Sequence, residues 1–396
     1  MTRAYVKPSL TDALIPVIVL ITLLAGTVHV FGLDSFGPNQ VALLLSAALA
    51  AVIGIKNGLS WKEVEQGMID TITVSLPAIL ILMMVGALIG SWILSGTVPS
   101  MIYYGVELMS PNYFYLTSCL VCALVGFSIG SSWTVAGTLG IGFMGIAAAL
   151  DLSLPISAGA IISGAYFGDK LSPLSDTTNL AAAVTNSDLF DHIQHMLWTT
   201  IPAFIVALTL FFVLGMGSDI HIKVTDIELL QAAMKDTFLV SPLMLVPLAL
   251  LLVMAVKKQP ALSTLVCGAL AGCVFALIFQ WPAVVGLAAD SSLNGVAAAF
   301  KGLLSAMFLG YSSSSGNEAL DTLLSKGGMS SMLMTIGLII NAMAFGGAMA
   351  RTGLLERLVE AALSRVKSAG GLVMTTVGTC IGTNILAADQ YLSIVI

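Results

Sequence analysis

Apolar runs separated by short polar segments extend along the whole chain. Most runs approach the length of about 20 residues that crosses the roughly 30 Å hydrocarbon core of a bilayer as an α-helix. Candidate spans with this pattern lie at residues 12–31, 40–55, 72–95, 113–129, 134–150, 154–167, 197–215, 238–256, 261–280, 296–310, 330–350 and 370–386. The pattern predicts an all-α polytopic membrane protein with about 11–13 transmembrane or half-membrane segments, some of them broken.

The composition excludes a water-soluble protein. Of the 396 residues, 58% are hydrophobic and 9% are charged, whereas an ordinary soluble domain carries about 25% charged residues. The net charge of −6 is spread over short loops, so nothing in it indicates nucleic acid as a partner. The first apolar run is long enough to span and lacks an obvious small-residue cleavage site, which favours a true first helix over a signal peptide. The expected partner is therefore the lipid bilayer.

Lys and Arg are distributed unevenly around the first two predicted helices. Arg3 and Lys7 precede the first helix, residues 32–40 contain no Lys or Arg, and Lys56 and Lys62 follow the second helix. Because positively charged residues concentrate in cytoplasmic loops, the N-terminus is predicted to lie in the cytoplasm and residues 32–40 outside.

Two parts of the chain resemble each other weakly. The segment Gly-Phe-Ser-Ile-Gly-Ser-Ser at residues 126–132 matches Gly-Thr-Cys-Ile-Gly-Thr-Asn at residues 378–384. Upstream, Gly96 and Gly353 each follow a long apolar run and precede an amphipathic stretch. With three spans between them, the parts are expected to be inverted repeats, as in many secondary transporters, and chance similarity between glycine-rich helices is the alternative. The predicted division is N-terminal helices at 1–60, a first repeat at 61–200, linking helices at 201–294 and a second repeat at 295–396.

A polar segment at residues 164–179 interrupts the apolar pattern. It holds two carboxylates, Asp169 and Asp176, among hydroxyl and amide side chains. Such groups are costly at membrane depth unless they face a cavity or one another. Pro173 breaks helical hydrogen bonding, and Ser175 or Asp176 is suited to cap a new helix. The segment is expected to form a re-entrant hairpin, with a water-exposed loop as the alternative.

The oxygen-rich composition of this segment suits sodium. Sodium is a hard cation that binds carboxylate, hydroxyl and carbonyl oxygens, and a carboxylate that also binds a proton lets the two ions compete for one site. The candidate ion- or proton-binding residues are Asp169, Ser172, Ser175, Asp176, Thr177 and Asn179 in the polar segment, Ser131 and Ser132 in the first repeat, and Thr383, Asn384 and Asp389 in the second. Within this set, sodium itself is assigned to Asp176, Asn179, Asn384 and Asp389.

Several candidates have simpler interpretations. Ser131 and Ser132 are small residues of the kind that also serve helix packing. Asp389 is placed to cap a helix after a break in the second repeat. Glu318 and Asp321 are candidates for a gate or a helix start, with a solvated loop as the default interpretation.

The polar segment is also where the chain resembles a known family. Residues 168–183 read Gly-Asp-Lys-Leu-Ser-Pro-Leu-Ser-Asp-Thr-Thr-Asn-Leu-Ala-Ala-Ala, and together with residues 316–329 and 384–393 they resemble the NhaC-type Na⁺/H⁺ antiporters of the ion transporter superfamily. The resemblance implies inverted repeats, helical hairpins that meet near the midplane, and coupled movement of Na⁺ and H⁺ without a cofactor. Some relatives instead exchange malate with a proton for lactate with sodium. Family members are expected to continue beyond Ile396, so a counterpart of the first hairpin is expected to be missing here.

These observations predict a secondary active transporter, not an enzyme, that exchanges Na⁺ for H⁺ across the bacterial inner membrane. A sodium- and proton-coupled organic-anion exchanger is the alternative. It needs a cationic or dipolar partner for carboxylate, and few basic residues lie within the predicted spans. A channel requires a continuous polar pore, and an enzyme requires a nucleophile with a base or a metal cluster; the sequence shows neither pattern. A homodimer is left open.

Overall fold

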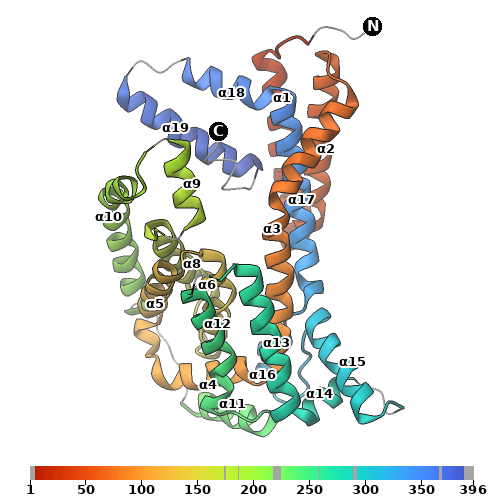
Figure 1. Ribbon diagram of the computed structural model, residues 1–396, viewed down its shortest axis with the longest axis vertical. Helices are drawn as coiled ribbons and strands as arrows, with labels where there is room; N and C mark the ends of the chain where they lie inside the picture. The colour runs from red at the N-terminus through yellow and green to blue at the C-terminus, as the bar shows by residue number, and fades with distance from the viewer. Residues whose placement is uncertain are drawn as a thin grey trace. The chain divides into compact units, whose positions relative to one another are not determined.

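The computed structural model describes residues 5–173, 175–185, 187–216, 224–257, 259–288, 292–364 and 368–387. In these ranges the chain is helical and has no strand (Figure 1). The helices are α1 (Leu10–Phe31), α2 (Phe36–Lys56), α3 (Trp61–Leu94), α4 (Thr97–Leu108), α5 (Phe114–Ile129), α6 (Ser132–Gly137), α7 (Leu139–Ala149), α8 (Leu154–Leu171), α9 (Asp176–Val184), α10 (Leu189–Met216), α11 (Val224–Thr237), α12 (Val246–Val256), α13 (Ala261–Phe279), α14 (Trp281–Leu287), α15 (Gly295–Phe308), α16 (Glu318–Leu324), α17 (Met329–Arg351), α18 (Leu354–Leu363) and α19 (Ala369–Ala387).

The described helices confirm an all-α polytopic membrane protein. Six of them, α1, α2, α3, α10, α13 and α17, are long and apolar enough to cross a bilayer. Two bent pairs raise this number to as many as eight: α4 with α5, bent by 100°, and α11 with α12, bent by 82°. Broken helices are therefore part of the fold, whereas the inverted arrangement of the two repeats stays a prediction.

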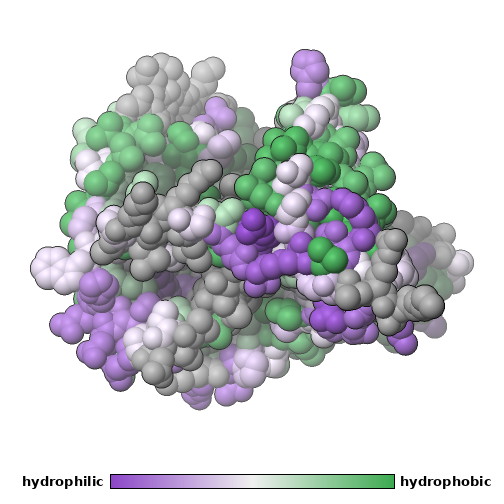
Figure 2. All heavy atoms as spheres, turned by 90° about the horizontal axis from the view of Figure 1, so that it is seen from above, coloured by the Kyte–Doolittle hydropathy of each residue, from purple (hydrophilic) through white to green (hydrophobic). Residues whose placement is uncertain are grey.

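Apolar and polar side chains are distributed over the surface as expected for helices in lipid. Large apolar side chains such as Ile18, Leu124 and Val206 are exposed along the sides of α1, α5 and α10. Hydrophilic residues instead gather in patches on the end of the molecule seen in Figure 2. Apolar sides are stable only against hydrocarbon, so the exposed positions indicate the lipid-facing surfaces.

Some helix boundaries differ from those that hydropathy predicts. α3 begins at Trp61 and α10 at Leu189, whereas the predicted spans begin at 72 and 197. The first turns of both helices are polar, so hydropathy alone does not detect them. α11 was not among the predicted spans, because its exposed face is charged. Leu230 and Met234, four residues apart, bury its apolar face.

The chain forms two compact units: unit 1 comprises residues 1–79 and 333–396, and unit 2 comprises residues 80–332. Each unit has its own apolar core. In unit 1, Phe345 and Met349 of α17 pack with buried residues of α1 and α2. In unit 2, Trp92 of α3 is fully buried and its indole N–H donates to the carbonyl of Gly268, at 2.9 Å. This bond satisfies the one polar atom of a side chain that otherwise packs in an apolar core.

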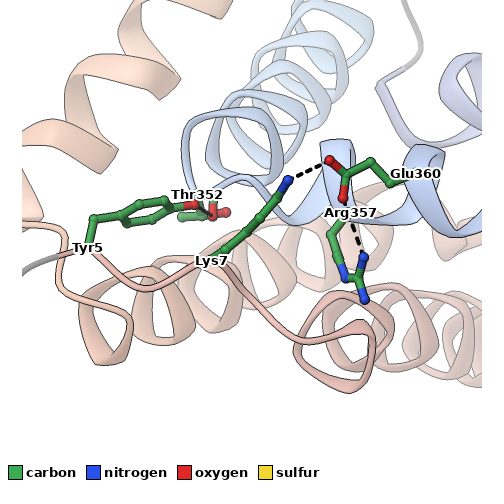
Figure 3. A network of polar contacts seen from close by, with 5 residues as sticks. All are labelled: Tyr5, Lys7, Thr352, Arg357 and Glu360. Atoms are coloured by element: carbon green, nitrogen blue, oxygen red, sulfur yellow. Dashed lines mark hydrogen bonds and ion pairs between the residues drawn. The ribbon is translucent and has the colours of Figure 1, made fainter.

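An N-terminal strap, residues 5–9, packs within unit 1 against the end of α17 and against α18 (Figure 3). The Tyr5 hydroxyl donates to the carbonyl of Thr352 at 3.3 Å, and Lys7 pairs with Glu360 of α18. Glu360 also accepts from Arg357 at 3.3 Å. The strap thus joins residues from opposite ends of the sequence.

Two helix elbows have the same local geometry. Gly96 follows α3 with φ +79°, and Gly353 follows α17 with φ +71°. This left-handed conformation is favourable for glycine and costs other residues roughly 1–2 kcal/mol. In each case the next helix is short, and α18 is strongly amphipathic in its sequence. The two glycines singled out as equivalent in the sequence therefore turn the chain in the same way.

Candidate functional site

The close packing of α5 on α8 positions the polar segment. Gly164 and Gly168 of α8 face the backbone of α5 so closely that a Cβ at either position would overlap the carbonyl oxygens of Cys119 and Ala123. Small residues at these positions let the two helix backbones approach without intervening side chains. The last turn of α8 is consequently held against the end of α5.

The break after α5 lies where the sequence predicts it. Gly130 ends the helix with φ +70°, and Ser131 is extended with φ −151°. The Ser131 Oγ then accepts from the backbone N–H of Thr134 at 3.3 Å, which caps α6. Ser131 therefore has a structural role in this break, and its side chain is half-buried. A second interruption at Thr138, between α6 and α7, was not predicted.

Asp169 lies in the last turn of α8 and is 5% exposed. One carboxylate oxygen, Oδ2, accepts from the backbone N–H of Ser132 at 3.1 Å and from its hydroxyl at 2.7 Å. The other oxygen, Oδ1, is buried and has no hydrogen-bond partner among the described residues. A buried carboxylate oxygen without a partner is costly, and a proton or a cation on it removes that cost. The contact with Ser132 therefore fixes one oxygen of Asp169 and leaves the other, buried oxygen open to a ligand.

The hairpin after Asp169 is held together by its own polar side chains. α8 ends at Leu171, just before Pro173, and α9 begins at Asp176. Ser172 and Ser175 are fully buried, and the N–H of Ser175 donates to the carbonyl of Ser172 at 3.2 Å. The predicted interruption of the helix is thus present, and its serines are buried instead of facing bulk water.

The first turn of α9 uses most of the remaining polar groups internally. The Ser175 and Thr177 hydroxyls lie 3.0 Å apart, and the Thr178 hydroxyl donates to the carbonyl of Lys170 at 3.0 Å. The Asn179 amide donates to the carbonyls of Pro173 at 3.0 Å and Ser175 at 2.6 Å. In this conformation the Asn179 amide closes the hairpin by donating to two of its carbonyl oxygens.

Several predicted site residues lie wholly or partly outside the described structure. Asp389 is outside the described residues. Thr383 and Asn384 belong to α19, but their side chains are outside what the structure describes, as is the side chain of Asp176. The assignment of sodium to Asp176, Asn179, Asn384 and Asp389 stays a prediction. α19 is helical through Gly382 to Ala387, so the break predicted there is wrong for the backbone. Glycine permits a left-handed turn, as at Gly130, without requiring one.

Asp321 has a structural role in the loop before α16. Its carboxylate accepts from the hydroxyl groups of Ser313 and Ser315, both at 2.7 Å, and from the N–H groups of Ser315 and Gly316, at 2.7 and 3.2 Å. These donors, led by the Ser313 hydroxyl, lower the pKa of Asp321 to about 2. Asn317 caps α16 by accepting from the N–H of Leu320. Asp321 therefore organises the loop, and the residue that starts the helix is Asn317.

A family model for the Na⁺/H⁺ antiporter family matches residues 164–396. The match begins at Gly164, at the start of the polar segment. This chain belongs to the Na⁺/H⁺ antiporter family. The resemblance inferred from the sequence motif is thereby confirmed.

Curated relatives of this antiporter family member cover most of the chain. It is 36% identical to the Na⁺/H⁺ antiporter NhaC of Alkalihalophilus pseudofirmus over 357 residues, which are 90% of this chain and 74% of that protein. It is 36% identical to the malate-2H⁺/Na⁺-lactate antiporter of Bacillus subtilis over 360 residues, 91% of this chain and 74% of that protein. It is 35% identical to the arginine/ornithine antiporter ArcD of Halobacterium salinarum over 394 residues, 98% of this chain and 77% of that protein.

Sequence reasoning missed two features of this antiporter's polar segment. The pairing of Asp169 with Ser132 joins residues on different helices, and no sequence spacing encodes it. Thr178 was not among the candidates, although its hydroxyl joins α9 to the end of α8. Its position three residues after the helix-capping Ser175, inside the same polar segment, is the signal that could have identified it.

Proposed function

We propose that this protein exchanges Na⁺ for H⁺ across the bacterial inner membrane, with its N-terminus in the cytoplasm and no cofactor beyond the transported ions. We further propose that Asp169 is a carboxylate that carries either ion. Membership of the Na⁺/H⁺ antiporter family supports the exchange. The observation that carries the role of Asp169 is its buried Oδ1, which has no partner among the described residues.

In the proposed exchange, Na⁺ and H⁺ compete for one position, the Oδ1 atom of Asp169. With a proton on Oδ1, Asp169 is neutral and its burial costs little. Without the proton, the carboxylate needs a cation close by, and Na⁺ suits its oxygen ligands. Ser132 donates two hydrogen bonds to Oδ2 in either state, so it fixes the carboxyl group while Oδ1 exchanges ligands. The two ions then bind in alternation.

The two elbows support the proposed inverted repeats. Gly96 and Gly353 adopt the same left-handed conformation at the ends of α3 and α17. Repeats of this kind place broken helices near the middle of the bilayer, where both halves contribute to one site. The proposal therefore retains Asp176, Asn384 and Asp389 as further polar groups of the ion path.

The test is Na⁺-driven proton movement in proteoliposomes that contain a pH-sensitive dye. Asp169→Asn keeps the shape of the side chain but cannot exchange a proton, so we expect no response to a sodium pulse. Asp151→Asn is the matched control, because Asp151 is exposed in the turn between α7 and α8, and asparagine tolerates its positive φ of 49°. Wild-type exchange by a folded Asp169→Asn protein would show that another carboxylate carries the ions, and Asp176→Asn is the next variant to measure.

Organic-anion exchange is the second candidate function. Two relatives are named for malate and lactate or for arginine and ornithine, all of which carry a carboxylate. The same assay distinguishes the functions: a simple ion exchanger responds to sodium alone, whereas an obligatory anion exchanger responds only when malate, lactate or arginine is also present.

A further inference from the structure

Two adjoining cavities in unit 2 lead from its surface toward α6. The outer cavity has a volume of about 760 Å³ and lies between α11, α16 and the turn joining α7 to α8. The inner cavity has a volume of about 250 Å³ and lies between α3, α4, α6 and α7. Leu323 and Lys326 line both cavities, so these two residues mark the position where one cavity passes into the other.

The inner cavity approaches the proposed ion site. Ala136 of α6 lines it, and Ser132 begins the same helix four residues earlier. Four residues of α-helix rise about 6 Å, so the inner cavity ends about one helical turn from the partner of Asp169. α11 and α16, which border the outer cavity, lie at the lower end of unit 2 in Figure 1, whereas α9 lies at its upper end.

Among the described residues, Lys326 is the one charged side chain that lines the inner cavity, whereas the outer cavity is lined by Lys326 and by the carboxylate of Glu318. Lys326 is exposed, and no carboxylate among the described residues lies within ion-pair distance of its ammonium group. The inner walls are apolar and include Ile93, Ile102 and Met144. An ammonium group at the neck of an apolar cavity attracts an anion and repels a bare cation.

We infer that the neck at Lys326 is a binding site for a small organic carboxylate. The carboxylate pairs with the Lys326 ammonium, and the short apolar body of the ligand packs on the inner cavity walls. A cavity of 250 Å³ corresponds to about eight water molecules at the density of the liquid, which suits a body of a few carbon atoms. Phosphate esters fit less well, because they are usually bound by several donors and the neck supplies one basic group.

Backbone contacts before and after α16 hold the backbone of Lys326 at the neck. The N–H of Tyr311 donates to the Lys326 carbonyl at 3.1 Å, and the N–H of Gly328 donates to the carbonyl of Gly86 in α3 at 2.7 Å. Gly327, next to Lys326, has φ +89° and packs against Gly90 so closely that a Cβ would not fit. The backbone of Lys326 is thus fixed against α3, which keeps the origin of the side chain at the neck.

This site extends the proposed function, because it adds a second ligand beside the Na⁺ and H⁺ exchanged at Asp169. The two are separable. The carboxylate binds at Lys326 through its own charge pair, and the cations bind at a different group about a turn beyond the inner cavity. A measurement of carboxylate binding therefore does not depend on the exchange reaction.

The first experiment measures binding of malate, lactate and arginine to the purified full chain by titration calorimetry in the presence of Na⁺. We expect at least one of them to bind, and Lys326→Gln to weaken that binding at least tenfold, as is usual for loss of a charge-assisted hydrogen bond. Lys326→Arg keeps the charge and is expected to stay within about threefold of wild type. Lys235→Gln is the matched control, because Lys235 lies over the ring of Tyr103 and lines neither cavity.

A second variant separates loss of charge from loss of fold. Lys326→Cys is expected to bind the carboxylate weakly, and modification with an aminoethyl thiosulfonate reagent, which restores an ammonium group, is expected to restore binding. A methyl thiosulfonate reagent, which adds no charge, is not expected to restore binding. The proposal is overturned if none of the three carboxylates binds to wild type, or if Lys326→Gln binds as wild type does.

Carboxylate binding and sodium-driven proton movement are measured separately, so the inference and the proposed function can fail independently. Sodium-driven proton movement without any carboxylate, together with no carboxylate binding, overturns the inference and leaves the proposed exchange intact. Lys326-dependent carboxylate binding, together with no sodium-driven proton movement in the absence of a carboxylate, supports the inference and contradicts simple Na⁺/H⁺ exchange.

Discussion

Ser132 donates both its backbone N–H and its hydroxyl to a single carboxylate oxygen of Asp169, at 3.1 and 2.7 Å, across the interface of α6 and α8. Both donors come from the first residue after a helix break, so the break supplies a donor pair that a continuous helix would use internally. The second oxygen of Asp169 has no partner among the described residues, and the proposed exchange places the transported ion on it. Because Ser132 binds only Oδ2, its contribution to transport can be measured by removing its hydroxyl group.

Ser132→Ala removes the hydroxyl donor and keeps the backbone donor. A hydrogen bond to a charged group contributes about 1.5–3 kcal/mol, so the rate of Na⁺-driven proton movement is expected to fall roughly tenfold to a hundredfold. Ser118→Ala is the matched control, since Ser118 is equally buried but donates only to the Tyr115 carbonyl within α5. If Ser132→Ala moves protons at the wild-type rate, the Ser132 hydroxyl has no role in transport.

Gly168→Ala tests the close packing that positions Asp169. The added methyl group would overlap the Ala123 carbonyl and the backbone of Phe127, and such overpacking costs about 1–3 kcal/mol. We expect a lower melting temperature in detergent. Gly159→Ala lies on the same helix with no atom near the added methyl group, so it is expected to be neutral or to stabilise by about 0.5–1 kcal/mol. The packing argument fails if both variants melt at the same temperature.

Asp321 gives a prediction for acid pH. Its pKa is lowered to about 2 in the folded protein from the ordinary value of 3.8, chiefly by the Ser313 hydroxyl. A lowered folded-state pKa stabilises the loop above the ordinary pKa, and this contribution is lost as pH falls from about 4 to about 2. The protection of the Ser315 and Gly316 amides against hydrogen exchange, relative to the intrinsic rate at each pH, is therefore expected to fall over that interval. α16 lies outside the candidate membrane spans, so these amides can be followed in detergent.

Asp321→Asn should show the same loss of protection at neutral pH, because the amide cannot replace the charged acceptor for four donors. Glu318→Gln is the control on the same helix, since Glu318 is exposed and makes no such set of bonds in the described structure. Unchanged exchange in Asp321→Asn would mean that other contacts hold the loop.

Orientation is tested by thiol labelling in whole cells. A cysteine at Ser35, between α1 and α2, is expected to react with a membrane-impermeant reagent added outside, and a cysteine at Lys62, at the start of α3, only after the cells are opened. The expectation rests on the Lys and Arg asymmetry of these loops. Labelling in the reverse pattern would invert the predicted topology.

Local sequence signals predicted the parts of the fold that local physics determines. Long apolar runs, the glycine after α5 and the proline after α8 each act within a few residues, and the helices end close to them. The amphipathic α11 escaped detection because its stability comes from burying Leu230 and Met234 against other helices. Hydropathy averaged over a window does not register a single buried face.

The candidate site could be predicted as a segment and not as a geometry. The polar residues at 164–179 identified the hairpin, but the partner of each group depended on tertiary contacts. Asn179 donates to the hairpin carbonyls, and Asp169 meets a serine 37 residues earlier in the sequence. The contacts of Asp321 could not be predicted either. Its donors precede it in the sequence without a helical spacing, and only the folded loop brings them to the carboxylate.

The N-terminal strap has a consequence for biosynthesis. Tyr5 and Lys7 emerge from the ribosome first, yet their contacts, the Thr352 carbonyl and Glu360, are made only after all of unit 2 has been translated. Unit 1 therefore stays open while residues 80–332 insert and fold, and α1, α2 and the start of α3 wait in the membrane for α17 and α18. Its assembly therefore follows the synthesis of unit 2, so a chain that stalls before residue 333 leaves these helices with their packing surface exposed to lipid and to quality-control proteases.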